Sequence, residues 1–223
     1  MKHTLSIIIV LSLFMMLYNP AIYTSTSSAL QNKVIVIDPG HGGLDNGASI
    51  AGVNEDDLNL KISFALKEAL ENQGATVYLT RSDDQDMTRR DYLYSKDDDM
   101  YLRVLQIDAY KPDLFLSIHL NSANKSAWGS QVFYYRKSKE AKKLASFIHD
   151  NMKETTGTQK NISECGFYVL RATKSLGVLI ECGFLSHANE RGQLKNSRYH
   201  KKLAKSITKG IVEYYEKKCH NKL

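Results

Sequence analysis

Four side chains that can bind a metal ion or carry a proton stand where predicted strands end or a predicted helix begins. His41 comes four residues after the first apolar run, and His119 and Glu181 each directly follow a later one. Glu55 lies in the first turn of the first predicted helix, which starts near the same edge. In an open α/β sheet the reactive crevice lies beyond the carboxyl ends of the strands. Two imidazoles and a carboxylate form the ligand set of a catalytic zinc site, and a second carboxylate nearby supplies a base.

Each of these residues alone also has an ordinary structural explanation. A single histidine after a strand is more often structural than catalytic, and Glu55 suits a helix N-terminus electrostatically. Cys182, next to Glu181, is either a nucleophile acting with His119 or a small core residue. Because neighbouring side chains of a strand point to opposite faces, we favour the core. The zinc hypothesis depends on all four groups meeting at one edge.

A glycine-rich segment, DPGHGG at residues 38–43, connects the first apolar run to the region of His41. It has neither the Lys-Ser/Thr pair of a P-loop nor the spacing of a dinucleotide-binding motif. We therefore favour glycines that let the backbone bring His41 close to an ion. Asp38 is a candidate for a phosphatase-type nucleophile, a turn former, or a carboxylate that holds an imidazole tautomer, and we favour the last of these.

Short β-rich runs alternate with helical patterns from residue 33 onward, which is typical of an α/β domain. Strands are expected at residues 34–37, 76–80, 113–118, 131–135, 167–170 and 178–180. Helices are expected at residues 55–72, 102–110, 140–153 and 199–215, and a long polar surface loop, with room for a helical turn, at residues 82–99. Continuous apolar runs indicate strands that are covered on both faces. The pattern therefore predicts a single α/β domain with helices on both faces of a mostly parallel, twisted sheet.

The composition is that of an ordinary folded domain with an excess of basic residues. Of 223 residues, 43% are hydrophobic and 24% are charged, which excludes a wholly disordered chain. The net charge of +6 suits nucleic acid, a membrane surface or an acidic wall polymer, although a basic domain without such a partner fits the charge equally well. Cys165, Cys182 and Cys219 are too few and too scattered for a disulfide framework or a Cys-rich zinc module.

Residues 1–30 have the pattern of an export segment. Lys2 and His3 precede an apolar stretch at residues 5–18, and small residues follow it. The stretch is shorter than the roughly twenty residues that a membrane span needs. We expect a signal peptide or an N-terminal membrane anchor at residues 1–30 and a zinc-dependent catalytic domain at residues 31–223. The protein is then exported to the cell envelope, either secreted or membrane-anchored.

An ordered series of motifs runs through the domain. It comprises VIDPGHGG at residues 36–43, Glu55 after GVN, Thr80-Arg81 followed by Asp83 or Asp84, SIHLN at residues 117–121, FYVL at residues 167–170, and VLIECGFLS at residues 178–186. Together these motifs resemble the zinc-dependent N-acetylmuramoyl-L-alanine amidases of the third amidase family, over residues 33–215. Leu120, Trp128, Tyr134 and Tyr135 look most similar to the germination-specific, spore-cortex branch.

The resemblance implies a six-stranded sheet, Zn²⁺ held by His41, Glu55 and His119, and Glu181 as the catalytic carboxylate. It also implies hydrolysis of the amide between the lactyl group of N-acetylmuramic acid and the L-alanine of peptidoglycan stem peptides. In the spore cortex, the peptide-free muramic acid is the precursor of a lactam. Enzymes of this kind can require an activating protein partner.

Three further residues are candidates for substrate contact. Asn121 suits the substrate amide or peptide, and Arg81 and Arg103 suit muropeptide carboxylates, although a turn residue and solvated arginines are the ordinary alternatives. The rival functions are another zinc hydrolase acting on wall peptides or sugars, and a non-catalytic wall-binding module. Nucleic-acid binding has the basic charge in its favour but no motif, so no nucleic-acid partner is expected.

Overall fold

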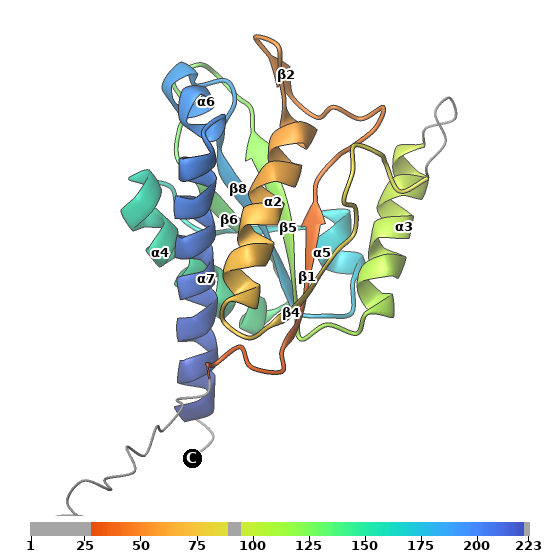
Figure 1. Ribbon diagram of the computed structural model, residues 1–223, viewed down its shortest axis with the longest axis vertical. Helices are drawn as coiled ribbons and strands as arrows, with labels where there is room; N and C mark the ends of the chain where they lie inside the picture. Colours follow the sequence, from red (N-terminus) through yellow and green to blue (C-terminus); the bar gives the residue numbers. More distant parts are fainter. Residues whose placement is uncertain (1–27, 89–94, 221–223) are drawn as a thin grey trace, which may run out of the picture.

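Six strands form one sheet in which most neighbours are parallel (Figure 1). Their order is β4 (Thr76–Leu79), β1 (Val34–Pro39), β5 (Leu114–Asn121), β8 (Gly177–Phe184), β6 (Gln131–Tyr135) and β7 (Ser163–Cys165). Only the pairing of β6 with β8 is antiparallel. The computed structural model describes residues 28–88 and 95–220, so nearly all of the expected export segment and part of the expected loop at residues 82–99 lie outside the described residues. Within the described ranges, no helix has the length and apolar character to cross a membrane.

Helices cover both faces of the sheet (Figure 1). One face carries α2 (Glu55–Glu71), α4 (Lys139–Thr156) and α7 (Ser197–His220), and α7 packs against both other helices. The opposite face carries α3 (Lys96–Ala109) and the short α5 (Tyr168–Ala172), which contact each other. The helix α6 (Ala188–Leu194) follows β8, and a two-stranded hairpin of β2 (Ser49–Ile50) and β3 (Val53–Asn54) precedes α2. The predicted α/β class with helices on both faces is confirmed.

Strand β1 shows how the sequence builds the two halves of the core. Its residues Ile35 and Ile37 belong to the apolar cluster under α2, α4 and α7, whereas Val36 belongs to the cluster under α3 and α5. Alternate residues of a strand point to opposite faces, so a continuous apolar run supplies both clusters. Ile107 of α3 and Phe115 of β5 belong to the second cluster together with Val36. This burial fixes the register of the strands whose ends carry the site.

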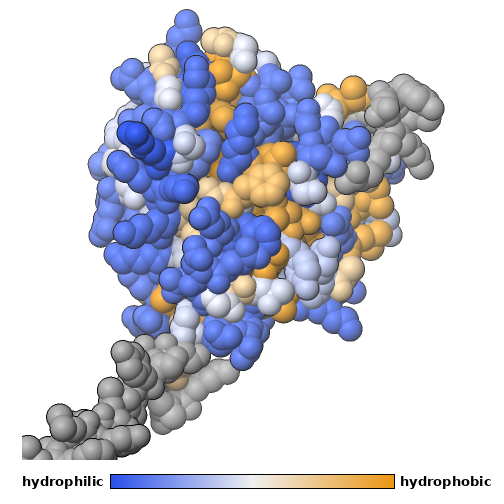
Figure 2. Space-filling view, viewed as in Figure 1, coloured by the Kyte–Doolittle hydropathy of each residue, from blue (hydrophilic) through white to orange (hydrophobic). Residues whose placement is uncertain are grey.

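Helix α7 is amphipathic, and its outer surface carries part of the basic excess. Leu203 and Ile207 are buried, while Lys201, Lys205 and Lys209 are exposed. This spacing is that of a helix with one apolar face. Figure 2 shows the side of the molecule formed by α2 and α7, where hydrophilic residues dominate over α7 and hydrophobic residues gather between α2 and α3.

One expected strand is wrong: the segment at residues 167–170 forms the start of α5, a helix that covers Tyr168–Ala172. Its aromatic and branched residues fit a strand by local preference. In the structure only Val169 and Leu170 are buried, and Phe167 is exposed. Tertiary packing of these two side chains against the sheet therefore decides the conformation. The strand β7 and the helix α6 were not expected from the sequence.

Helix α3 begins at Lys96, six residues before the expected start at residue 102. Three aspartates, Asp97, Asp98 and Asp99, occupy its first turn, and the Ser95 side chain accepts a hydrogen bond from the Asp98 N–H. Acidic side chains and a serine cap both stabilise a helix N-terminus. The polar stretch that suggests a loop is therefore a helix start, and it places Lys96 and Asp97 beside the sheet edge that carries the site.

We expect Gly210→Ala in α7 to destabilise the fold, although alanine ordinarily favours a helix by about 1 kcal/mol over glycine. A Cβ at Gly210 would lie 2.6 Å from the Cα of Ile148 and from the carbonyl oxygen of Phe147 in α4, so the two helices must separate. Gly192 in α6 is the matched control, because nothing lies within 4 Å of its added Cβ. Urea unfolding should show a loss of about 1–3 kcal/mol for Gly210→Ala and no loss for Gly192→Ala. Equal stabilities of the two variants would contradict the close approach.

Candidate active site

Three side chains from separate segments meet beyond the carboxyl end of the sheet. His41 lies in the loop after β1, Glu55 is the first residue of α2, and His119 lies on β5. Glu55 Oε1 is 3.2 Å from His41 Nε2 and 3.1 Å from His119 Nδ1. One potential ligand atom from each of the three residues lies within 4.8 Å of the other two. The sequence expectation that these groups share one edge thus agrees with their positions.

Two glycines permit this convergence because side chains occupy the space where a Cβ would stand. A Cβ at Gly40 would lie 2.1 Å from the ring of His119. At Gly47, which has a φ of 62°, a Cβ would lie 2.6 Å from Glu55 Oε2 and 2.7 Å from the ring of His41. Any other residue at either position would push a site residue aside. His41 itself has a φ of 62°, a left-handed conformation that is uncommon for a non-glycine residue.

Asp45 is the carboxylate that orients His41. Its Oδ2 lies 2.8 Å from His41 Nδ1, which leaves Nε2 of the same ring directed to Glu55. The sequence interpretation gave an imidazole-holding role to Asp38, and the structure assigns that contact to Asp45 instead. The spacing of four residues between His41 and Asp45, across a glycine-rich loop, is the signal that could have indicated it.

The electrostatics of the cluster favour a positive charge between its acidic groups. Burial lowers the pKa of His41, but hydrogen bonds to Asp45 and Glu55 outweigh burial and raise it to about 9. Burial raises the pKa of Glu55, but hydrogen bonds from His119 and His41 outweigh burial and hold it well below its ordinary value. Glu55 is therefore an anion, and either protons on the rings or a bound cation can balance it. Two imidazole nitrogens and one carboxylate oxygen are donors that fit zinc.

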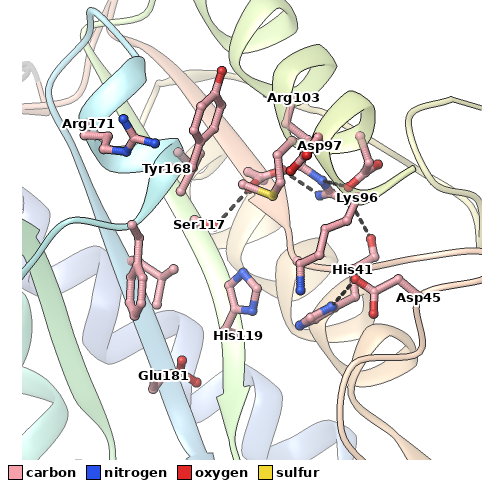
Figure 3. Close-up of a pocket in the computed structure, with 17 residues that line it drawn as sticks. His41, Asp45, Lys96, Asp97, Arg103, Ser117, His119, Tyr168, Arg171 and Glu181 are labelled. Carbon is pink, nitrogen blue, oxygen red and sulfur yellow. Dashed lines mark hydrogen bonds and ion pairs between the residues drawn. The ribbon is translucent and has the colours of Figure 1, made fainter. Parts of the chain in front are cut away.

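Glu181 lies beside this cluster on the neighbouring strand. It pairs with His119 in the register of β5 and β8, so the two side chains leave the sheet on the same face (Figure 3). Its Oε2 is buried and has no hydrogen-bond partner among the described residues. Burial raises the pKa of Glu181 to about 7. A carboxyl group with a pKa near neutrality can both accept and return a proton.

The next residue, Cys182, is fully buried in the apolar cluster on the opposite face of the sheet. Burial raises the pKa of its thiol well above the ordinary value, so the reactive thiolate is disfavoured. The preferred sequence interpretation of Cys182 as a core residue is confirmed.

Arg81 holds the loop that carries His41. It is 2% exposed, and its guanidinium donates to the carbonyl oxygens of Pro39, Gly40, Asp56 and Asp83. Every nitrogen of the guanidinium is used in these bonds. This placement makes Arg81 a support for the loop and for the start of α2, and its expected contact with substrate carboxylates stays a prediction.

Arg103 is 1% exposed and holds the same loop from the side of α3. It donates to the carboxylates of Asp38 and Asp99 at 2.9 and 2.8 Å, and to the carbonyl oxygens of Pro39 and His41. All of its guanidinium nitrogens are likewise engaged, so its expected contact with substrate also stays a prediction.

Asp38 is the partner that anchors Arg103 to the sheet. Besides Arg103, it accepts hydrogen bonds from the hydroxyl groups of Thr80 and Ser117 at 2.7 and 2.9 Å. Burial raises the pKa of Asp38, but Arg103 and the hydrogen bond from Thr80 outweigh burial and lower it. Asp38 is therefore a buried, ionised support for the loop, and its engagement by Arg103, Thr80 and Ser117 argues against the alternative of a phosphatase-type nucleophile.

Asn121, the last residue of β5, lies two residues beyond His119 and is half-buried. Its carbonyl oxygen accepts a hydrogen bond from the N–H of Leu185, which ties the end of β5 to the segment after β8. The expected contact of its side chain with substrate stays a prediction.

A groove of about 630 Å³ opens over the cluster (Figure 3). His41, His119 and Glu181 line it at the sheet edge, while residues of α3 and α5 form its two walls. The groove is large enough for several sugar or peptide units, and pockets of this size commonly bind ligands. The groove can therefore hold an extended ligand across His41, His119 and Glu181.

Comparison with known proteins identifies what this arrangement is similar to. Residues 35–213, which include all four candidate residues, match the family described as N-acetylmuramoyl-L-alanine amidase. The germination-specific N-acetylmuramoyl-L-alanine amidase of Bacillus subtilis (strain 168) is 38% identical over 200 residues, covering 86% of this chain and 84% of that protein. The crystal structure of an N-acetylmuramoyl-L-alanine amidase from Clostridium difficile 630 aligns with a TM-score of 0.75 at 30% identity, covering 84% of this chain and 99% of that one. The structure of the CwlD amidase from Clostridioides difficile, in complex with the GerS lipoprotein, aligns with a TM-score of 0.73 at 31% identity. The alignment covers 83% of this chain and 99% of that one.

We expect Arg103→Met to destabilise the protein by about 3–5 kcal/mol at neutral pH, because it leaves Asp38 and Asp99 buried without their cation. Arg103 lowers the pKa of Asp38 in the folded protein. The stabilisation that this ion pair gives the folded state is therefore complete above about pH 4 and is lost as the pH falls below that value. The stability gap between wild type and variant should therefore shrink on acidification, as urea unfolding at several pH values can show. Arg136→Met, at an exposed arginine, is the control and should change stability little. A gap that stays constant down to acidic pH would argue against the ion pair.

Proposed function

This chain belongs to the N-acetylmuramoyl-L-alanine amidase family, and from that premise we propose that it is an exported, zinc-dependent hydrolase of peptidoglycan. The bond cut is the amide between the lactyl group of N-acetylmuramic acid and the L-alanine of the stem peptide. The observation that carries this proposal is the cluster of His41, Glu55 and His119 beside Glu181, whose buried Oε2 has no hydrogen-bond partner among the described residues. No other group of three such ligands is found in the described part of the chain.

The donor set supports zinc as the ion. His41 Nε2, His119 Nδ1 and one oxygen of Glu55 are the atoms that would hold it, and three protein ligands leave one position for water. When bound, zinc supplies a Lewis acid that polarises a carbonyl oxygen and brings the pKa of water toward neutrality. Asp45 keeps the Nε2 atom of His41 unprotonated and directed inward when the ion is present, because the Asp45 carboxylate accepts a hydrogen bond from Nδ1–H and so fixes the proton on that nitrogen.

Glu181 carries the proton through the reaction. As the oxygen of water bonds to the amide carbon, Glu181 accepts one proton of that water. It then delivers the proton to the alanine nitrogen while the carbon–nitrogen bond breaks. The products are the carboxylic acid of the lactyl group and a peptide with a free N-terminal amine. The nitrogen is a poor leaving group unless it is protonated, so the return of the proton matters as much as the attack.

A role in the spore cortex is the finer part of the proposal. It is supported by the relative in Bacillus subtilis, whose name describes it as germination-specific, at 38% identity over most of both chains. In that role the peptide-free muramic acid would be the precursor of muramic lactam. The CwlD amidase of Clostridioides difficile is in complex with the GerS lipoprotein, and it supports an activating protein partner for this chain as well. Export through a signal peptide or membrane anchor at residues 1–30 completes the proposal.

The products of digestion test the reaction. Intact peptidoglycan is incubated with the protein, with and without a chelator, and the products are identified by mass spectrometry. Muramic acid with a free lactyl carboxyl group, together with peptides that begin at L-alanine, is the expected result, and the chelator should abolish it. Released acetate or cut peptide bonds would instead indicate another zinc hydrolase of wall sugars or peptides. Zinc binding without any cleavage would indicate a wall-binding module.

Glu181→Gln should lower turnover by at least the 10²–10⁴-fold that general acid–base transfer supplies, because glutamine cannot accept the proton. The metal content should stay at the wild-type level. Activity on muropeptides and zinc per chain are measured together on the same preparation. Glu164→Gln, at an exposed glutamate of β7, is the matched control and should keep both the wild-type activity and the wild-type zinc content. Substantial residual turnover in Glu181→Gln would refute its role.

His119→Ala should lose the metal, because it removes one of three protein ligands. Zinc analysis after dialysis against a weak chelator should give about one ion per chain for wild type and well under half of that for the variant. His220→Ala, at an exposed histidine near the end of α7, should retain wild-type zinc. Full zinc occupancy in His119→Ala would remove this residue from the ligand set.

A further inference from the structure

Two basic side chains line the groove from opposite walls. Lys96 comes from the first turn of α3, and Arg171 comes from α5. Figure 3 shows Lys96 extending from α3 into the groove toward His41 and His119, while Arg171 lies beside Tyr168 on the other side. Both side chains are exposed, and within the described ranges neither forms an ion pair. They differ in this from Arg81 and Arg103, whose guanidinium groups are buried and make four hydrogen bonds each within the protein.

Most of the acidic groups that line the groove are already balanced. Asp38 and Asp99 pair with Arg103, and Asp45 bonds to His41. Asp97, beside Lys96, is the remaining exposed carboxylate of the lining. Each wall of the groove therefore presents one solvent-exposed cation, Lys96 on α3 and Arg171 on α5, with which a carboxylate of a ligand can pair.

The short helix α5 sets the position of Arg171. Tyr168 and Arg171 are three residues apart and therefore lie on the same side of the helix. The guanidinium carbon lies 5.0 Å from the centre of the Tyr168 ring, a cation–π contact that restricts the side chain. A guanidinium held in this way loses less conformational entropy when it binds a planar anion. Buried Val169 and Leu170 hold the helix on the sheet, so this cation stands on a fixed support.

The rest of the wall suits a peptide with alkyl portions. Met100 of α3 and Leu179 of β8 also line the groove, and Phe167 at the start of α5 is 44% exposed. Apolar lining with a few polar groups is typical of sites that orient an extended ligand. A peptide with carboxylates that lies along this groove would contact both the apolar surface and the two cations.

We propose that Lys96 and Arg171 bind carboxylates of the stem peptide and give this enzyme a preference for acidic over amidated peptides. This inference rests on the proposed function, because the peptide is the leaving group of that reaction. Carboxylates are the groups that a guanidinium binds through two parallel hydrogen bonds. Lys96 and Arg171 are exposed to the groove, whereas Arg81 and Arg103, whose expected substrate contact stays a prediction, are buried.

Two synthetic N-acetylmuramoyl peptides test the proposal. They have the same sequence, but the peptide carboxylates beyond L-alanine are free in one and converted to carboxamides in the other. Wild-type zinc enzyme should cleave the free form with a kcat/KM about 25-fold higher, since each partly exposed ion pair contributes about fivefold. Lys96→Met and Arg171→Gln should each reduce this preference to about fivefold, mainly through a higher KM for the free form, and the double variant should abolish it.

Arg136→Gln and Lys137→Met together are the matched control. This exposed pair follows β6, which is antiparallel to β8, and so lies at the opposite edge of the sheet from Glu181. The control should keep the full preference for the free form. A lost preference in the groove variants alone supports the proposal, because a general loss of folding would affect both substrates equally.

The other outcomes overturn it in distinguishable ways. If wild type cleaves the two peptides equally well, or if the double variant keeps the preference, the assignment of Lys96 and Arg171 is wrong and the amidase function stands. If wild type cleaves neither peptide at the lactyl amide, the proposed function is wrong and this inference is wrong with it.

Discussion

One carboxylate oxygen that contacts two imidazoles is the constraint on which the site depends. Glu55 Oε1 lies within 3.2 Å of nitrogens from both His41 and His119, and these three residues come from a loop, a helix start and a strand. A shift of any one segment by about an ångström would break the cluster, because hydrogen bonds and metal ligation tolerate little change in distance. The sheet register, the glycines at positions 40 and 47, and the two buried arginines all act to hold these segments in place.

The parts of this site that could be predicted from sequence are those fixed by the strands. Strands with continuous apolar runs are buried on both faces, and their carboxyl ends meet at one edge, so His119 and Glu181 could be placed there without coordinates. The start of α2 at Glu55 followed from helical spacing. These positions depend on local periodicity, and a single sequence is enough to show it. The ordered motifs added the family, which the comparisons then confirmed.

The parts that sequence did not give are those decided by contacts between distant segments. Asp45, rather than Asp38, orients His41 because the loop turns back on itself through positive φ angles at His41 and Gly42, and spacing alone does not show that turn. Residues 167–170 favour a strand by composition, yet burial of only two of the side chains in α5 makes a helix the better solution. In both cases tertiary packing overrides local preference, as expected for short segments next to a functional site.

Burial separates two kinds of basic residue that look alike in the sequence. A buried guanidinium must have its donors satisfied by the protein, because an unpaired buried charge costs several kcal/mol. Arg81 and Arg103 meet that requirement with four hydrogen bonds each, to backbone carbonyl oxygens and, for Arg103, also to Asp38 and Asp99. Most of their donors are therefore already used within the protein. Arg171 and Lys96 avoid the requirement because water solvates them, so they can exchange water for an anionic group at little loss. The same physical rule that makes the first pair good supports therefore makes the second pair the better candidates for recognition.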